Sequence, residues 1–286
     1  MGLARSIGTT LEMIKWEHSI FALPFALTGA MLAAGGWPSG RQVFWIVICM
    51  VTARSAAMAF NRWADAGLDA VNPRTAKRAI PAGALSRGFV AAFTALMSIA
   101  FILAAAQLNR ATLLLSPFAL AILLSYSYTK RFTRWSHLVL GLALGIAPAA
   151  AWIAIQGRLD PRILVLTAAV VFWVAGFDVL YACQDMEHDR QFNLNSIPRY
   201  LGISGSFWVA RGMHVVMLCL LLWLLKLFSL NGIAWVGVIV VAGLLLYEHL
   251  IVSPTDLRRL NAAFFTMNGI ISFVFFCAVA AALLLR

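Results

Sequence analysis

Apolar residues run along this chain in long blocks, and short polar clusters separate each block from the next. A helix needs about 20 predominantly apolar residues to cross a bilayer. The blocks therefore predict transmembrane helices, and the clusters between them, rich in Gly, Pro and Asn, predict turns. We expect nine spans, at residues 19–36, 42–60, 88–107, 111–128, 137–155, 162–181, 207–228, 232–250 and 262–285.

The composition agrees with this pattern. Of the 286 residues, 62% are hydrophobic and only 12% are charged, which is about half the charged fraction of an average soluble domain. The sequence thus predicts an all-α polytopic membrane protein, with about nine transmembrane helices around a central cavity and one domain over residues 1–286. The four cysteines are scattered and form no CxxC pair, so neither a zinc site nor a disulfide framework is expected.

The basic residues are divided unevenly between the two sides of the predicted bundle. The N-terminal tail and the loops after the second, fourth, sixth and eighth spans hold fifteen of the 22 Lys and Arg residues. The positive-inside rule places these loops in the cytoplasm. The net charge of +11 then reflects membrane orientation and contact with anionic lipid or substrate, and no nucleic-acid partner is predicted.

Acidic residues gather at the cytoplasmic ends of the second and sixth predicted spans. Six of the eleven acidic residues lie in two segments, 61–69 and 178–189. Their matching positions predict an internal pseudo-repeat of helices 1–4 and 5–8, followed by a ninth helix. Asn61, Asp65 and Asp69 are spaced by four residues, so they share one face of a helix. A narrow arc of the sixth span and its extension would hold Asp178, Tyr181, Asp185 and Asp189.

These acidic segments are costly at a membrane unless a cation meets them. Oxygen ligands without His or Cys favour Mg²⁺, which usually keeps coordination positions for water and for a substrate phosphate. The two segments together therefore predict a Mg²⁺ site for a phosphorylated ligand.

Basic residues follow both acidic segments. Such bases beside Mg²⁺-binding acids suit a diphosphate, because the metal and the bases share its negative charge. Arg199 follows the second segment and is a candidate for a further diphosphate clamp. Alternatively, the bases only fix the orientation of the chain in the membrane. The first loop and the end of the fourth span contribute Arg74, Lys77, Arg78, Lys130 and Arg131.

Arg54 lies inside the second predicted span, two turns deeper than Asn61 on the same face. No carboxylate stands three or four residues away on its own helix. A cation at this depth needs a partner, and a substrate carboxylate is a good candidate. The alternatives are helix carbonyls or an acid on another span.

The pattern of these residues resembles the UbiA superfamily of intramembrane aromatic prenyltransferases, over nearly the whole chain. The resemblance implies transfer of a polyprenyl group from a polyprenyl diphosphate to a ring carbon of an aromatic acid such as 4-hydroxybenzoate, in quinone biosynthesis. It also implies an integral protein of the bacterial cytoplasmic membrane with its active site on the cytoplasmic side. The residues that carry it are Asn61, Asp65, Asp69, Tyr126, Lys130, Asp178, Tyr181, Asp185 and Asp189.

The resemblance also implies roles for individual residues. Arg54 would hold the carboxylate of the acceptor, and Tyr126 and Lys130 would contact the diphosphate. Asp178 would orient the ligands or shape the inner pocket. Mg²⁺ and the diphosphate would be held by Asn61, Asp65, Asp69, Asp185 and Asp189.

Two features depart from the common pattern. Many members have Asp directly after the first Asn, where this chain has Arg62, which leaves the number of metal ions open. Segments 15–24, 247–249 and 261–269 are similar to a branch linked to menaquinone made by the futalosine route. In that branch the acceptor would be 1,4-dihydroxy-6-naphthoate, so the sequence leaves two acceptors open, as it does the prenyl chain length and the oligomeric state.

Two functions of other classes compete with this interpretation. A secondary transporter would use intramembrane acids as a proton or cation relay, but here the acids lie at helix ends beside basic loops. A structural or assembly factor does not explain why the acids cluster. Dependence on Mg²⁺ separates the enzyme from both.

Overall fold

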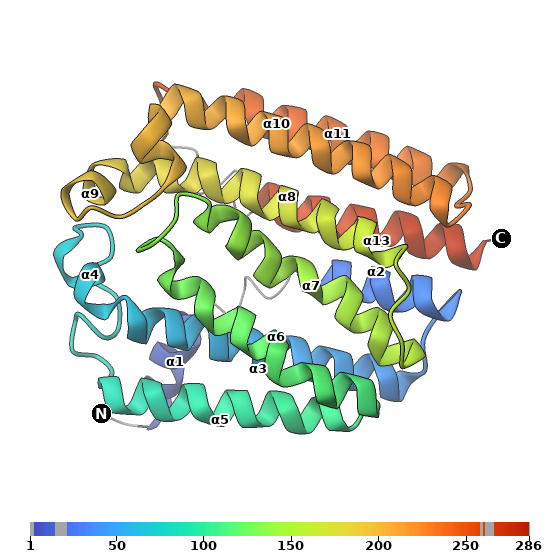
Figure 1. The fold of residues 1–286 in the computed structure, drawn as a ribbon, viewed down its shortest axis with the longest axis horizontal. Coiled ribbons are helices and arrows are strands. Elements are labelled where there is room, and N and C mark those ends of the chain that lie inside the picture. Colours follow the sequence, from blue (N-terminus) through green and yellow to red (C-terminus); the bar gives the residue numbers. More distant parts are fainter. Residues whose placement is uncertain (1–2, 15–21, 258–259, 261–265, 286) are drawn as a thin grey trace.

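The structure is a computed structural model, which describes residues 3–14, 22–257, 260 and 266–285. This part of the chain is helical and contains no β-strand, and its long helices lie side by side as one bundle (Figure 1). The longer helices are α2 (Leu23–Ala34), α3 (Gly40–Ala64), α5 (Arg87–Ala106), α6 (Arg110–Thr129), α7 (Ser136–Gln156), α8 (Ile163–Ala182), α10 (Ile197–Leu227), α11 (Gly232–Ile251) and α13 (Asn268–Leu284).

Short helices lie at the end of the bundle where α3 stops and α10 begins (Figure 1). α1, which the sequence did not predict, packs against α3. The other short elements directly follow the two helices that carry the acidic segments. Their bounds are Leu3–Ile14 for α1, Ala66–Val71 for α4, Cys183–Asp185 for the 3-10 helix and Met186–Gln191 for α9.

Seven helices in the described part of the chain are long and apolar enough to cross a membrane, where nine were expected. The other two apolar helices, α2 and α13, are shorter, with 12 and 17 residues. They fall within the expected first and ninth spans, whose residues 19–21 and 262–265 lie outside the described residues, as do most of segments 15–24 and 261–269. The all-helical membrane fold is confirmed, and the count of nine is approximate.

The seventh long helix begins earlier than the hydrophobic pattern predicts. α10 starts at Ile197, not near residue 207, because the hydroxyl of Ser196 accepts a hydrogen bond from the backbone N–H of Arg199 and so caps the helix. Gly202 then kinks the helix, with φ 68° and ψ 179°, a backbone conformation that favours glycine. The polar first turns of α10 therefore extend beyond the apolar stretch that the sequence marks.

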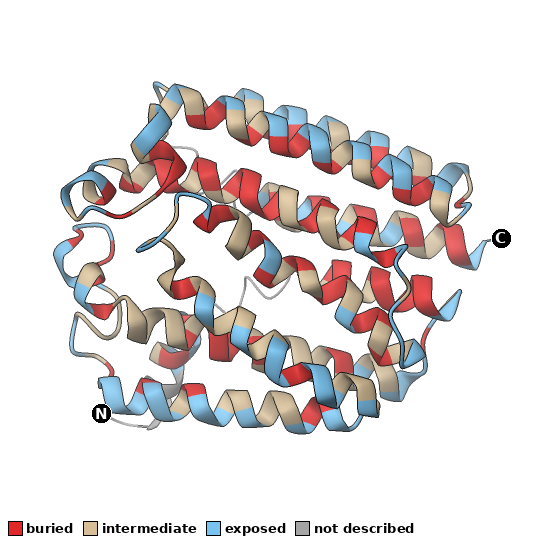
Figure 2. Cartoon of the chain, in the orientation of Figure 1, coloured by how far each residue is buried: buried red, intermediate tan, exposed pale blue. Residues whose placement is uncertain are grey.

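α8 occupies the centre of the bundle and packs against α7 and α10. Most of its length is buried (Figure 2). Trp173 at its middle is fully buried and meets Phe25 of α2, with ring centroids 4.9 Å apart. α7 and α8 approach closely at Gly141, which has no side chain to hold them apart. A Cβ added there would lie only 2.4 Å from the carbonyl oxygen of Val171. This close pair of helices brings the inner end of the acidic segment on α8 against the start of α7.

Candidate active site

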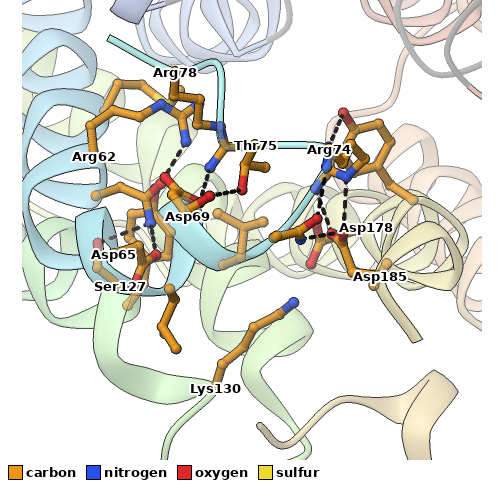
Figure 3. A pocket seen from close by; sticks show the side chains of 18 of the residues that line it. Arg62, Asp65, Asp69, Arg74, Thr75, Arg78, Ser127, Lys130, Asp178 and Asp185 are labelled. Atoms are coloured by element: carbon orange, nitrogen blue, oxygen red, sulfur yellow. Dashed lines mark hydrogen bonds and ion pairs between the residues drawn. The ribbon is translucent and has the colours of Figure 1, made fainter. Parts of the chain in front are cut away.

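A cavity of about 720 Å³ opens at the end of the bundle where α4 and α9 lie. Residues of both acidic segments line it, together with the bases that follow them. Figure 3 shows Asp65 and Asp69 on one side of this cavity, and Asp178 and Asp185 on the other. Segments more than a hundred residues apart in the sequence thus meet at one site.

The first acidic segment keeps its shared face across a break in the helix. α3 ends at Ala64, and Asp65 stands between α3 and α4 with φ −96° and ψ 4°. The backbone N–H of Asp65 still bonds to the carbonyl of Asn61 at 3.0 Å, and that of Asp69 bonds to the carbonyl of Asp65 at 2.8 Å. The helical spacing therefore continues, and all three side chains face the cavity, as predicted.

The second acidic segment is not one continuous α-helix. α8 ends at Ala182, and a 3-10 turn precedes α9, so the helical arc predicted from Asp178 to Asp189 is interrupted. Both of these residues nevertheless line the cavity, together with Tyr181 and Asp185 between them. The remaining acid, Glu187, points away and pairs with Arg190 at 3.0 Å.

Each of the four acids at the cavity mouth is paired with a base. Arg78 lies 2.7 Å from Asp69, and Arg131 lies 3.2 Å from Asp65. In the second segment, Lys130 lies 3.4 Å from Asp189, and Nε of Arg74 donates to Oδ1 of Asp185 at 2.8 Å. The acids and bases that the sequence assigns to metal and diphosphate thus neutralise one another in this structure (Figure 3).

Arg74 connects the two acidic segments. Its side chain leaves the loop after α4 and reaches Asp185, where Asn72 of the same loop also donates a hydrogen bond of 3.1 Å. It further donates to the hydroxyl of Tyr181 at 3.2 Å. Burial is the largest single influence on Arg74 and opposes its charge, but the hydrogen bonds and charges of Asp185 and Tyr181 together outweigh burial and raise the pKa of the guanidinium. Burial also raises the pKa of Asp65, partly offset by its hydrogen bond from Arg131.

The oxygen atoms at the mouth suit a hard cation. Oδ2 of Asp69 is buried and has no hydrogen-bond partner, so one carboxylate oxygen is left without a proton donor or a cation. The neighbouring donors are carboxylate and amide oxygens, the ligands that Mg²⁺ prefers. In the described residues, however, no three acidic, His or Cys side chains are already gathered around a metal position. A metal would therefore take carboxylates that now hold bases.

The inner end of the cavity is different in character. Arg54 lines it beside Tyr126 and Asp178, and the rest of the inner wall is largely apolar. Nε of Arg54 is buried without a hydrogen-bond partner, and no acid of the described chain forms an ion pair with this guanidinium. The alternative that an acid on another span neutralises Arg54 therefore receives no support. The apolar wall consists of Met58, Leu140, Leu144, Val174 and Phe177.

Comparison with known proteins assigns the chain to a family. Residues 22–283 match the UbiA prenyltransferase family. The chain belongs to this family. A relative from Cupriavidus necator, named 4-hydroxybenzoate octaprenyltransferase, is 32% identical over 252 residues, 86% of each chain. A relative of the same name from Idiomarina loihiensis is 30% identical over 277 residues, which cover 96% of this chain and 93% of the relative.

Solved structures agree with this membership. The apo structure of a UbiA homolog from Aeropyrum pernix K1 has a TM-score of 0.84 and 33% identity, over 92% of this chain and 97% of that one. A UbiA homolog from Archaeoglobus fulgidus, bound to DMAPP and Mg²⁺, has a TM-score of 0.70 at 19% identity, over 97% of this chain and 100% of that one, and thus shares the fold. The protein is an integral membrane prenyltransferase.

The prenyltransferase cavity contains every site residue predicted from the sequence except one. Lys77 lines the mouth beside the paired bases. Arg199 does not line the cavity, because its guanidinium donates to the carbonyl of Leu194 at 3.0 Å and to the side chain of Asn193. Arg199 thus holds the loop before α10 and is not placed to clamp a diphosphate.

Arg62, which the sequence left unexplained, has a clear position. It lines the cavity and donates to the amide oxygen of Asn61 at 3.2 Å. It therefore competes for the atom with which Asn61 would bind a metal.

Two further polar residues at the site were missed by the sequence reasoning. Asn72 contacts Asp185, and His137 contacts Asp178. The contact between His137 and Asp178 could have been predicted from the turn at Gly157, because the two residues lie about equally far from this turn on α7 and α8. Residues equally far from the turn of an antiparallel helical hairpin face each other.

Proposed function

We propose that this prenyltransferase transfers a polyprenyl group from its diphosphate to a ring carbon of an aromatic acid, with Mg²⁺, at the cytoplasmic side of the bacterial inner membrane. The observation that carries the proposal is the polarity of the cavity. Its mouth holds acids paired with bases, and its inner end holds Arg54, whose Nε has no partner. A diphosphate with a metal suits the first environment, and a carboxylate suits the second.

At the mouth, binding of the donor would exchange ionic partners. The bases would turn from the carboxylates to the diphosphate oxygens, with which they form charge-assisted hydrogen bonds. The freed carboxylates would hold Mg²⁺, which when bound neutralises the charge that develops on the leaving diphosphate. The residues that would hold the metal are Asn61, Asp65, Asp69, Asp185 and Asp189, and the bases are Arg74, Lys77, Arg78, Lys130 and Arg131.

At the inner end, Arg54 would bind the acceptor carboxylate, and Tyr126 and Asp178 would orient the ring. The bond between the allylic carbon and the diphosphate oxygen breaks, and a ring carbon ortho to the acceptor's hydroxyl forms a bond to that allylic carbon. The ring proton at this position is then lost, which restores aromaticity. The apolar inner wall keeps water from the electron-poor allylic carbon.

Two aromatic acids are candidates for the acceptor. The relatives from Cupriavidus necator and Idiomarina loihiensis carry the name 4-hydroxybenzoate octaprenyltransferase, which favours 4-hydroxybenzoate. The segments 15–24, 247–249 and 261–269 favour 1,4-dihydroxy-6-naphthoate. Both candidates have an aromatic carboxylate for Arg54 and a hydroxyl that activates the ring.

The test is a transfer assay with the purified protein in lipid vesicles. Labelled prenyl diphosphate is supplied with either aromatic acid, with Mg²⁺ or with EDTA. We expect label in one prenylated acid, none in EDTA, and recovery when excess Mg²⁺ is added. Product that forms undiminished in EDTA would contradict the metal-dependent mechanism, and absence of product with either acid would contradict the proposed function.

A further inference from the structure

His137 forms two hydrogen bonds that join three helices beside the inner end of the cavity. It lies in the first turn of α7 and is fully buried. Its Nδ1 lies 2.6 Å from Oδ2 of Asp178 on α8. The backbone N–H of Ile197, the first residue of α10, donates to its Nε2 at 3.3 Å. The proposed roles of Arg54, Tyr126 and the metal ligands leave His137 without an assigned function.

The two contacts fix the tautomer of the ring. A backbone N–H can only donate, so Nε2 of His137 must accept and cannot carry a proton. The ring proton is then on Nδ1, from which it is donated to Asp178. The neutral imidazole thus satisfies both neighbours, and a protonated ring would set two N–H groups against each other.

This donation fixes the orientation of Asp178. One carboxylate oxygen, Oδ2, is held by His137 at the wall of the cavity. The other oxygen, Oδ1, has no hydrogen-bond donor from the described chain, and the side chain is 21% exposed toward the cavity that it lines. An ionised carboxylate only accepts hydrogen bonds. The free oxygen is therefore suited to a ligand with a hydroxyl donor.

We propose that His137 is a positioning residue for the aromatic acceptor and acts through Asp178. His137 turns Asp178 so that Oδ1 accepts a hydrogen bond from the acceptor's ring hydroxyl, while Arg54 binds the carboxylate of the same molecule. Two fixed ends set the position of the ring carbon that attacks the allylic carbon. This inference rests on the proposed function, because it needs an acceptor that carries both groups.

The donor end of the cavity is anchored to the loop before α10 by a contact that does not involve His137. Ile197 begins α10 directly after the loop that follows the second acidic segment. In that loop the backbone N–H of Asn195 donates to the carbonyl of Lys130 at 2.7 Å, and Lys130 pairs with Asp189 at the mouth. Lys130 is therefore held by a backbone bond of its own, which does not involve His137, so removal of the His137 side chain should leave the diphosphate-binding residues in place.

The test measures steady-state rates and divides them by the number of donor-binding sites in each sample. A variant that yields less folded protein is then compared fairly with the wild type. His137→Phe keeps a ring but removes both hydrogen bonds. We expect it to lower kcat/KM for the acceptor about 10²-fold, the effect of a reactant displaced by about 1 Å, while KM for the prenyl diphosphate changes less than about twofold. His137→Asn places an amide N–H near the position of Nδ1 and should restore most of this loss.

A second variant keeps the test decisive if His137→Phe does not accumulate as folded protein. Asp178→Glu retains the charge but moves the carboxylate by one methylene, away from the donor on His137. The same acceptor-specific loss is expected.

The matched control is His214→Phe, since His214 is also buried and bonds to His249 at 2.9 Å, but does not line the cavity. It should lower thermal stability and leave both KM values unchanged.

Acceptor kinetics equal to those of the wild type in His137→Phe or in Asp178→Glu would overturn the inference, as would equal losses for donor and acceptor. The proposed function would remain intact in either case. If the wild type prenylates neither aromatic acid, the proposed function itself fails, and the inference fails with it.

Discussion

At the scale of single residues, Arg54 gives the most direct information about the chemistry of the substrate. A buried guanidinium with an unpartnered Nε lowers the stability of the folded protein. An apolar residue at this position would give a more stable fold if position 54 served only the fold. The cost is explained if the protein's ligand supplies the partner. An aromatic carboxylate fits, because it is planar and can accept two parallel hydrogen bonds from the guanidinium.

We therefore expect Arg54→Ala to raise KM for the aromatic acid about 10- to 100-fold, the usual worth of a hydrogen bond to a charged group. KM for the prenyl diphosphate should stay near its wild-type value, because the diphosphate binds at the other end of the cavity. Initial rates with each substrate varied in turn measure both constants. Equal increases in the two constants would assign Arg54 a general structural role.

The sequence predicted the acids and bases of the site but not their pairing. The spacing of Asn61, Asp65 and Asp69 was enough to place them on one face. The partner of Arg74 was not predictable, because a long side chain in a loop can reach several elements, and here it crosses to Asp185. Arg199 was wrongly placed by analogy with that loop, because local contacts to Leu194 and Asn193 hold it away from the cavity.

At the scale of elements, the close approach of α7 and α8 positions the acceptor end of the site. Gly141 packs against the backbone of α8, where an added Cβ would lie 2.4 Å from the carbonyl oxygen of Val171. A backbone atom cannot move aside as a flexible side chain can. The contact between His137 and Asp178 lies one turn from Gly141 on α7 and two turns from Val171 on α8, and it depends on this spacing.

Gly141→Ala should accordingly destabilise the protein by about 1–3 kcal/mol, the range for overpacked interiors. Gly243 of α11 is the matched control, since it also lies within an apolar helix but has no neighbour within 4 Å of an added Cβ. Gly243→Ala should be neutral or stabilising because Ala favours helix. Thermal unfolding in detergent compares the two, and equal effects would contradict the packing argument.

The helices themselves followed largely from the hydrophobic pattern, and the exceptions have local causes. α10 begins before its apolar stretch because Ser196 caps a polar first turn. The second acidic segment departs from a single α-helix because a 3-10 turn at Cys183–Asp185 joins α8 to α9. Hydrophobicity does not record either feature, since both depend on polar and backbone hydrogen bonds.

At the scale of the whole molecule, the central claim is that the two acidic segments form one donor site. They come from α3 with α4 and from α8 with α9, and they meet at one cavity (Figure 3). Arg74 and Asn72 already join them. The pseudo-repeat of helices 1–4 and 5–8 remains a prediction, although each acidic segment leads from a long helix into a short one.

The most direct test of this claim is the binding affinity of geranyl diphosphate for the purified protein, measured calorimetrically with Mg²⁺ and with EDTA. We predict that binding needs Mg²⁺ and weakens at least about tenfold in Asp65→Ala and in Asp185→Ala. The double variant should have nearly the same affinity for geranyl diphosphate as the single variant with the lower affinity, because both residues belong to one site and their losses do not add. Glu187→Ala, an exposed acid of the second segment, should bind as the wild type does. Unchanged affinity in EDTA, or in either single variant, would contradict the account.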